Sequence, residues 1–239
     1  METFTTRIHY LMHDDRTDEP YLYMISGDRL TLQIDAGNAP EATISFQKEL
    51  QQAGFQKPDL AVLTHWHWDH TFGLDAMQCP VIASSLTDRK LREVMKWKWN
   101  EESMQKRLET GEDIPFCDEH IRVQYPDLSK IHVRHADVAF AGDLSIDLGG
   151  VTAILEQRDS PHTRDSVFIR IPEEGVLIGG DAEYPDYYDY DSKYDPERLA
   201  FFIHYLEVTE FDTYLRGHDE AAVSKADLLR QMKEIAEQG

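Results

Sequence analysis

The chain has few cysteines and no long apolar segment. Its 239 residues include only two cysteines, Cys79 and Cys117, and these are not spaced as C-x-x-C, so the sequence suggests no disulfide framework. No apolar stretch is long enough to span a bilayer. Residues Met1–Phe4 lack the basic and apolar regions of a signal peptide. We therefore expect reduced thiols, a cytoplasmic location and no membrane partner.

Basic residues are scarce beside acidic ones. The chain has 24 Lys and Arg against 45 Asp and Glu, a formal net charge of −21. Nucleic acids and anionic lipid surfaces are bound mainly through Lys and Arg, so this balance argues against both as partners. The surplus charge is expected to keep the surface solvated and to attract cations, including metal ions. A small molecule is the expected partner, and no feature of the sequence indicates an oligomeric state.

The N-terminal part alternates strands and a helix. Residues 21–34 are typical of a β-hairpin. Asn38 is a predicted N-cap for a helix that continues to about Ala53. Residues 60–63 form an apolar run that predicts a buried strand.

The middle of the chain has little strand pattern. Apolar residues recur near a helical period over residues 87–110, which predicts one helix ending at Gly111. Trp97 and Trp99 interrupt its apolar stripe, and they would suit either a core or a cleft. We expect a helical insertion at about residues 85–135.

Strand signals return from Asp143 onward. Short β-rich runs are followed by a helix capped by Asp195, a short strand and a closing helix capped by Ser224. The predicted runs are 144–148, 151–156, 167–171, 176–178 and 214–215. This order predicts an α/β fold, a four-layer αβ/βα sandwich of two mixed sheets with helices on the outer faces, as one domain over residues 1–239.

A cluster of metal-binding side chains follows the strand at residues 60–63. His65, His67, Asp69 and His70 fall within six residues, in the pattern H-x-H-x-D-H. Ligands of α/β sheets collect at the carboxyl ends of strands, and imidazoles and carboxylates are ligands for zinc and similar ions. The cluster therefore predicts a divalent metal site.

Three later residues could complete such a site. His162, Asp181 and His218 each come shortly after an apolar run. A single loop histidine or a Gly-Asp pair is weak evidence by itself. Their shared position at predicted strand ends makes them candidates to join the first cluster.

In this order the motifs resemble those of the metallo-β-lactamase superfamily of metal-dependent hydrolases, over about residues 21–220. The resemblance implies two divalent ions, one bound by His65, His67 and His162, the other by Asp69, His70 and His218, with Asp181 bridging both. Nitrogen and oxygen ligands without a cysteine favour zinc, although iron and manganese also bind such sites. The resemblance further implies a metal-bridging hydroxide as nucleophile, with Asp69 as the catalytic residue that orients it.

The substrate class follows from smaller features. β-Lactam-hydrolysing relatives generally lack an aspartate at position 181, so the likeness is nearer to the thioesterase, lactonase and phosphodiesterase branches. Pro161 replaces a glycine common in relatives, and Thr163 is followed by Arg164 rather than a Pro-Gly pair, which leaves the subfamily open. We expect hydrolysis of a small ester, lactone or thioester.

Two alternatives stay open. A phosphodiesterase acting on a small nucleotide or phospholipid headgroup would need basic residues near the phosphate, and Arg164 and Arg216 are the nearest in sequence. A non-hydrolytic metal-binding or redox member is the other alternative. The redox relatives usually carry glutamate where this chain has His67, which argues against it.

Residues 183–194, EYPDYYDYDSKY, contain five tyrosines directly after Asp181. They would form either a packed loop or a substrate wall in which a tyrosine hydroxyl donates to an oxyanion. Tyr184, Tyr188, Tyr194 and Trp68 are the predicted substrate-binding residues.

Overall fold

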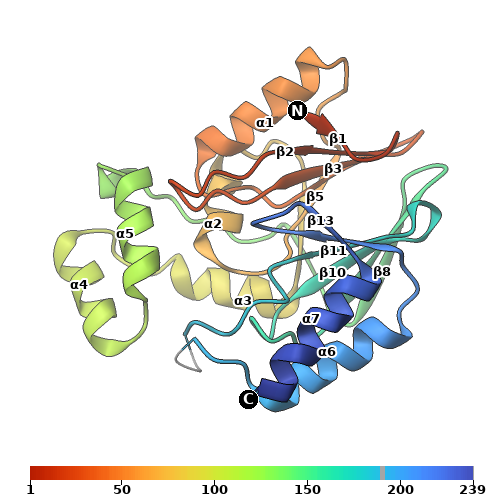
Figure 1. Cartoon of the computed structure of the whole chain (residues 1–239). Helices are drawn as coiled ribbons and strands as arrows, with labels where there is room; N and C mark the ends of the chain where they lie inside the picture. The colour runs from red at the N-terminus through yellow and green to blue at the C-terminus, as the bar shows by residue number, and fades with distance from the viewer. Residues whose placement is uncertain (189–191, 239) are drawn as a thin grey trace.

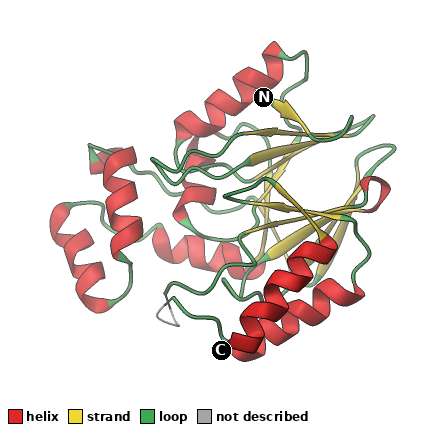
Figure 2. Cartoon of the chain, viewed as in Figure 1, coloured by secondary structure: helices red, strands yellow, loops and turns green. Residues whose placement is uncertain are grey.

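The computed structural model describes residues 1–188 and 192–238. Two β-sheets of seven and six strands pack face to face, and helices cover their outer faces (Figures 1 and 2). This confirms the predicted four-layer α/β sandwich of two mixed sheets.

The first sheet contains the N-terminal strands in sequence order. Its first four strands are antiparallel neighbours, and the remaining pairs are parallel. The strands are β1 (Glu2–Thr3), β2 (Ile8–Leu11), β3 (Leu22–Ser26), β4 (Thr31–Ile34), β5 (Leu60–Val62), β6 (Val81–Ser84) and β7 (Val138–Phe140).

The second sheet has the order β13-β12-β11-β10-β9-β8. Only the pair of β11 and β12 is parallel. Its strands are β8 (Asp143–Asp147), β9 (Thr152–Gln157), β10 (Val167–Ile171), β11 (Val176–Gly180), β12 (Thr213–Arg216) and β13 (Ala222–Ser224). The sequence patterns did not reveal β1, β2, β7 and β13, which are short or lie at sheet edges.

The helices form the outer layers, and the central strands between them are buried on both faces. The described helices are α1 (Pro40–Gln52), α2 (Trp68–Thr71), α3 (Ser85–Val94), α4 (Glu101–Thr110), α5 (Pro115–Gln124), α6 (Pro196–Val208) and α7 (Lys225–Gln238), with 3-10 turns at Phe72–Ala76, Leu128–Lys130 and Pro172–Glu174. Along β3, Tyr23 and Ile25 face the second sheet, while Leu22 and Met24 pack against Phe46 of α1. Because both faces are covered, the strand is apolar throughout.

The opposite outer face has the same construction. Helices α6 and α7, blue in Figure 1, pack on the second sheet through Phe202 and Leu228, which contact a cluster that includes Phe168 and Tyr214. Asp195 caps α6 as predicted, because its carboxylate accepts from the backbone amides of the first turn. The two sheets thus share one apolar interior and have one covered outer face each.

Two local predictions were wrong. The helix after β4 begins at Pro40 with Ala39 in the N-cap position, and the Asn38 side chain instead donates to the Thr17 carbonyl at 2.8 Å. The predicted helix at residues 87–110 is two helices, α3 and α4. The chain turns between them because the Asn100 side chain caps α4, accepting from the Ser103 amide at 2.9 Å.

The two tryptophans in that break belong to the packing of the helical segment. The Arg107 guanidinium lies 4.6 Å from the ring centroids of both Trp97 and Trp99. Both rings pack against the apolar cluster under α4 and α5. The core alternative for these residues is therefore the observed one.

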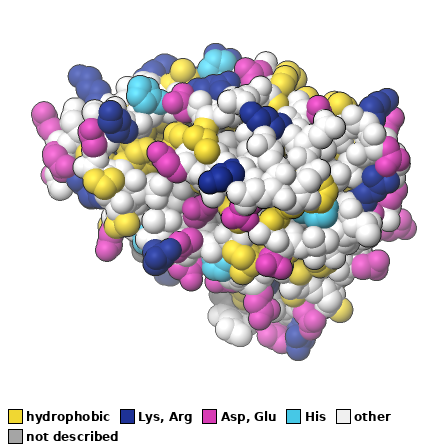
Figure 3. Space-filling model, turned by 90° about the horizontal axis from the view of Figure 1, so that it is seen from above, with side chains coloured by type: hydrophobic (Ala, Val, Ile, Leu, Met, Phe, Trp, Pro, Cys, Tyr) yellow, Lys and Arg dark blue, Asp and Glu magenta, His cyan; other side chains and the backbone are white. Residues whose placement is uncertain are grey.

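The surface shows the mixture of acidic and basic side chains that the composition predicts. Figure 3 shows Lys and Arg side chains scattered among acidic ones on the face seen there, without one continuous basic surface. None of the helices in the described part of the chain has the length and apolarity needed to cross a membrane.

Asn100→Ala should lower the free energy of unfolding by about 1 kcal/mol, because it leaves the first amides of α4 without their side-chain acceptor. Denaturant unfolding measures the effect. Asn100→Asp should retain most of the stability, and Lys106→Ala, an exposed position on the same helix beyond its first turn, should have little effect. Equal losses for Asn100→Ala and Asn100→Asp would contradict the capping role.

Candidate metal centre

The seven candidate ligands come from five separate segments that meet at one edge of the sandwich. His65 and His67 lie in the loop after β5, and Asp69 and His70 lie in α2. His162 lies between β9 and β10, Asp181 follows β11, and His218 follows β12. All of these side chains are buried or nearly so. Their potential ligand atoms form two compact groups, each with all its atoms within 4.8 Å of one another.

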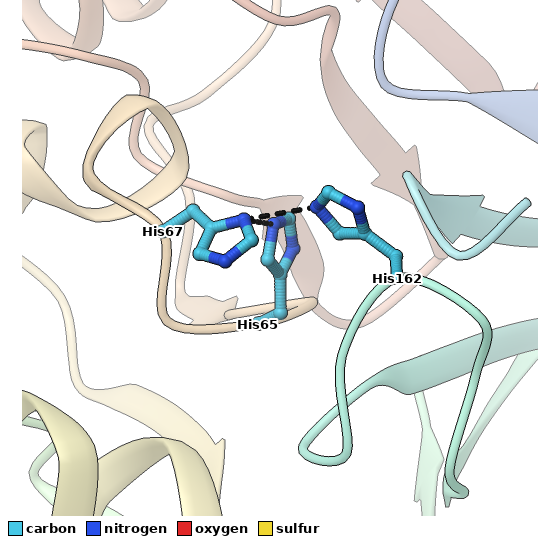
Figure 4. A group of neighbouring side chains, drawn as sticks. All are labelled: His65, His67 and His162. Atoms are coloured by element: carbon cyan, nitrogen blue, oxygen red, sulfur yellow. Dashed lines mark hydrogen bonds between the residues drawn. The ribbon is translucent and has the colours of Figure 1, made fainter. Parts of the chain in front are cut away.

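The first group contains three imidazoles, His65, His67 and His162, which point toward one another (Figure 4). The Nδ1 atom of His67 lies 3.0 Å from Nε2 of His65 and 2.9 Å from Nε2 of His162. An imidazole nitrogen carries either one proton or one lone pair, so Nδ1 cannot satisfy both neighbours. A cation that accepts all three lone pairs would resolve this arrangement.

Electrostatics also favour a cation among these imidazoles. Burial lowers the pKa of His65 and His67 well below the ordinary value and lowers that of His162. The rings are therefore neutral near pH 7, the form in which histidine binds a metal.

The second group contains Asp69, His70, Asp181 and His218. The Nε2 atom of His70 lies 3.0 Å from Oδ2 of Asp69 and 3.2 Å from Oδ2 of Asp181. The Nε2 atom of His218 lies 3.2 Å from Oδ2 of Asp69 and 3.5 Å from Oδ2 of Asp181. Two carboxylates and two imidazoles thus converge on one point.

Opposite charges set the pKa values in this second group. Burial favours neutral His218, but Asp181 and Asp69 outweigh burial and raise its pKa to about 9. The pKa of His70 is likewise raised well above the ordinary value, against the effect of burial. Burial opposes the ionised form of Asp181 too, yet His70 and His218 lower its pKa to about 2. Protons on His70 and His218 therefore occupy the place of a metal ion when none is bound.

Asp181 has a feature expected of a bridging ligand. Its Oδ2 atom faces the second group, while Oδ1 is buried and has no hydrogen-bond partner within the described chain. An unpaired buried oxygen costs about 1–3 kcal/mol unless a cation or donor reaches it. A Cβ atom at Gly217 would lie within 1.8 Å of this oxygen, so glycine is required for the close approach of β12 and β11 here.

A second set of contacts orients the ligands. Asp35 has a left-handed backbone (φ +59°), and its Oδ2 atom lies 2.8 Å from Nδ1 of His70. The same carboxylate accepts from the amide and hydroxyl of Thr64 at 2.7 and 2.8 Å. Nδ1 of His162 lies 3.0 Å from the Pro185 carbonyl. Such contacts fix the ring orientation of metal-binding histidines. The sequence analysis missed Asp35, although its position directly after β4 is a signal for it.

A cavity of about 680 Å³ opens onto both groups. His67, Asp69, His162, Asp181 and His218 line its floor. The described walls come from the β2–β3 loop, the start of α5, and the loops after β11 and β12: Asp15, Asp18, Ile114, Pro115, Phe116, Cys117, Tyr184, Tyr187, Tyr188, Ser192 and Asp219. These dimensions suit a small-molecule ligand.

Two of the four predicted substrate-binding residues line this cavity. Tyr184 and Tyr188 do so, but the Tyr184 hydroxyl donates to Asp219 at 2.6 Å and the Tyr188 hydroxyl to the Cys117 sulfur at 3.4 Å. Both hydroxyls therefore already have acceptors, and the rings supply the wall.

Tyr194 and Trp68 lie elsewhere. The Tyr194 hydroxyl donates to the Glu183 carbonyl at 3.0 Å, and its ring packs toward the α6–α7 core. Trp68 is buried against Phe72. Neither is among the described residues that line the cavity. Tyr190, in the same loop, lies outside the described residues.

Several wall residues had no signal in the sequence. Asp15 and Asp18 approach the site only because the β2–β3 loop crosses it, and Phe116 because α5 begins there. Asp219 directly follows His218, and that adjacency was a usable signal.

The fold and the two His and Asp groups are those of an α/β sandwich protein with a candidate metal-binding site. The family model described as the metallo-beta-lactamase superfamily matches residues 18–234, and the chain belongs to this superfamily. A comparison with curated proteins found no match.

Solved structures share the fold at low sequence identity. A metallo-beta-lactamase from Pontibacter korlensis is 16% identical, with a TM-score of 0.65 over 99% of this chain and 98% of its own. A superfamily protein from Sulfolobus tokodaii is 20% identical, with a TM-score of 0.57 over 96% of this chain and 86% of its own. A sec-alkylsulfatase from Pseudomonas sp. is 14% identical, with a TM-score of 0.68 over 98% of this chain but only 40% of its own.

Metal binding at pH 7 should release about two protons per chain beyond any that metal-bound water loses, because His70 and His218 must lose theirs while His65, His67 and His162 are already neutral. Since the pKa of His218 is about 9, its proton should no longer be released once the pH rises above that value, and binding should tighten between pH 7 and 9. Calorimetric titration in buffers of different ionisation enthalpy measures this. His218→Gln should release one proton fewer, and no release by the unaltered protein would contradict the assignment.

Proposed function

We propose that the protein is a dinuclear metal-dependent hydrolase that cleaves a small ester, lactone or thioester. The observation that carries this proposal is the convergence of seven nitrogen- and oxygen-bearing side chains on the floor of one cavity, where Asp181 has an unpartnered oxygen. In this proposal His65, His67 and His162 hold one ion, Asp69, His70 and His218 hold the other, and Asp181 bridges them. Zinc suits the donor set best, and elemental analysis distinguishes it from iron and manganese.

When bound, two such ions would lower the pKa of water and polarise the bond to be cleaved. The chain's own contribution centres on Asp69, which lines the cavity. Burial opposes its ionised form, but His70 and His218 hold its pKa well below the ordinary value. Asp69 is therefore an ionised hydrogen-bond acceptor that can orient the attacking water.

The walls would bind the organic part of the substrate. Ile114, Phe116 and the Tyr187 and Tyr188 rings give the cavity an apolar side opposite the polar floor. Burial of acyl or leaving-group carbons against these residues would place the scissile carbonyl over the ligands and exclude bulk water.

The phosphodiesterase alternative would need Lys or Arg beside the phosphate, and the described residues that line the cavity include neither. Arg216 forms an ion pair with Glu183 at 3.2 Å, and Arg164 lies 3.5 Å from Asp159. Neither is among the described residues of the cavity wall. A carboxylic ester or thioester carries no such requirement and is therefore favoured.

A hydrolysis panel tests the substrate class. It contains a lactone, a thioester, a β-lactam and an activated phosphodiester, each with and without a metal chelator, on protein purified without chelator. Turnover of the lactone or thioester that the chelator abolishes is the expected result. Turnover of the phosphodiester alone would favour the alternative, and metal-loaded protein inactive on all four would favour a non-hydrolytic role.

Asp69→Ala should lower kcat/KM by at least about 100-fold, because it removes both a metal ligand and the acceptor that orients water. Steady-state kinetics with the best substrate of the panel measures the loss, and circular dichroism checks the fold. The matched control is Asp143→Ala. It removes an exposed carboxylate on β8 that is paired with Arg158, and it should leave kcat/KM unchanged. Near-normal turnover by Asp69→Ala would contradict its catalytic role.

A further inference from the structure

The walls of the cavity carry more negative charge than metal binding requires. Asp15, Asp18 and Asp219 line it in addition to the ligands Asp69 and Asp181. No Lys or Arg occurs among the described lining residues. The stretch 189–191, outside the described part, has the sequence Asp-Tyr-Asp and so contains no basic residue either. An anionic substrate group would find no counter-charge on these walls.

Lys and Arg side chains of the surrounding segments do not belong to the described lining. Lys193 directly follows the lining residue Ser192 but is not itself among the described lining residues. The Lys90 ammonium lies 4.7 Å from the centroid of the Trp66 ring. Arg216 is paired with Glu183 at 3.2 Å. Of the histidines around the wall, His13 lies 3.2 Å from Asp15, and His120 contacts the Phe116 carbonyl at 2.8 Å. Asp219 accepts a hydrogen bond from the Tyr184 hydroxyl, and within the described chain neither Asp18 nor Asp219 forms an ion pair with Lys or Arg. His218 and His120 act on Asp18 only at longer range.

The three wall carboxylates are too far apart for a third metal ion. Within the described residues, only the two ligand groups bring their oxygens and nitrogens within 4.8 Å of one another, and Asp15, Asp18 and Asp219 belong to neither. Asp15 and Asp219 are exposed at the rim, whereas Asp18 is half-buried. Carboxylates spread over a wall in this way suit an organic cation, which is larger than a metal ion.

Aromatic rings share the same wall. Tyr184, Tyr187 and Tyr188 line the cavity beside Asp219 and Asp18. The negative faces of aromatic rings attract ammonium groups, most strongly quaternary ones that hydrogen bonds cannot satisfy. Asp18 adds a carboxylate that is half-buried in the same wall. A partly desolvated carboxylate attracts a cation more strongly than one fully in water.

We propose that the substrate carries a positively charged ammonium group, bound by Asp18, Asp219 and the tyrosine wall while its ester or thioester carbonyl faces the metal ligands. The inference rests on the proposed hydrolase function and specifies its substrate. Binding of the cation at the rim and of the carbonyl at the floor would orient the substrate along the cavity. Asp18 and Asp219 are thus the residues that determine specificity for charge.

Three thioesters that differ only in the charge of the leaving group test this proposal. Acetylthiocholine is cationic, S-(3,3-dimethylbutyl) thioacetate is its neutral isostere, and S-(2-sulfonatoethyl) thioacetate is anionic. We expect kcat/KM to be about tenfold higher for the cationic than for the neutral ester and lower again for the anionic one, with the differences narrowing as salt rises. A neutral or anionic ester that is cleaved as well as the cationic one would overturn the inference and leave the hydrolase function intact.

Substitutions that remove a single negative charge test which carboxylate determines the preference for the cationic ester. Asp18→Asn keeps the shape of the side chain and removes its charge, and its backbone (φ +54°) is one that asparagine tolerates. It should reduce the ratio of cationic to neutral kcat/KM at least about fivefold. Asp147→Asn, an exposed carboxylate paired with Arg29 at 3.0 Å, is the control and should leave the ratio unchanged. An unchanged ratio in Asp18→Asn would overturn the role of this residue.

Binding measurements test the cation site separately from the proposed hydrolase function. Choline and 3,3-dimethylbutanol are titrated by calorimetry into metal-loaded protein, and choline should bind more tightly, with the preference reduced in Asp18→Asn. This result would support the cation site even if no ester were hydrolysed, which would count against the proposed function alone. Equal or absent binding of both compounds would overturn the cation site.

Discussion

The burial of unlike charges beside one another is the interaction on which this site depends. Asp69 and Asp181 lie opposite His70 and His218 in a place shielded from water, and three further imidazoles stand a few ångströms away. Buried charges are costly unless they are paired, so each member of the second group requires the others. With protons on the two histidines the group is balanced, and a divalent ion can replace those protons without exposing an unpaired carboxylate.

The architecture follows from the need to bring these side chains together. His65, His67, Asp69 and His70 belong to the first sheet's half of the sandwich, while His162, Asp181 and His218 belong to the second. Neither half alone contains a complete set for either ion in the proposed assignment. The shared apolar core, in which Val62 and Ile178 belong to one cluster, fixes the distance between the halves. Packing of the core beneath the site therefore sets the geometry of its ligands.

The sequence predicted what is local and missed what depends on tertiary contact. The spacing H-x-H-x-D-H and the strand that precedes it predicted the first cluster, and position after apolar runs suggested the other three residues. The position of Asp35 after a strand marked it only as a possible site residue, whereas its orienting role depends on a left-handed backbone and on a histidine 35 residues away. The helix at 87–110 was predicted as continuous because periodicity outweighed the capping preference of Asn100. Of the cavity walls, only the tyrosine-rich loop had a signal that the sequence analysis used, whereas the β2–β3 loop and the start of α5 carry no motif.

The net charge of −21 has a specific consequence at this cavity. A large negative charge spread over the surface mainly keeps a protein in solution, but the same sign on the cavity walls selects among ligands. In the proposed assignment the two carboxylates of the floor hold metal ions, whereas Asp15, Asp18 and Asp219 have no part in that assignment. Carboxylates beside an anion-attracting metal pair would hinder an anionic substrate, so their presence on the wall is better explained by a ligand that is positive at one end and polar but uncharged at the other.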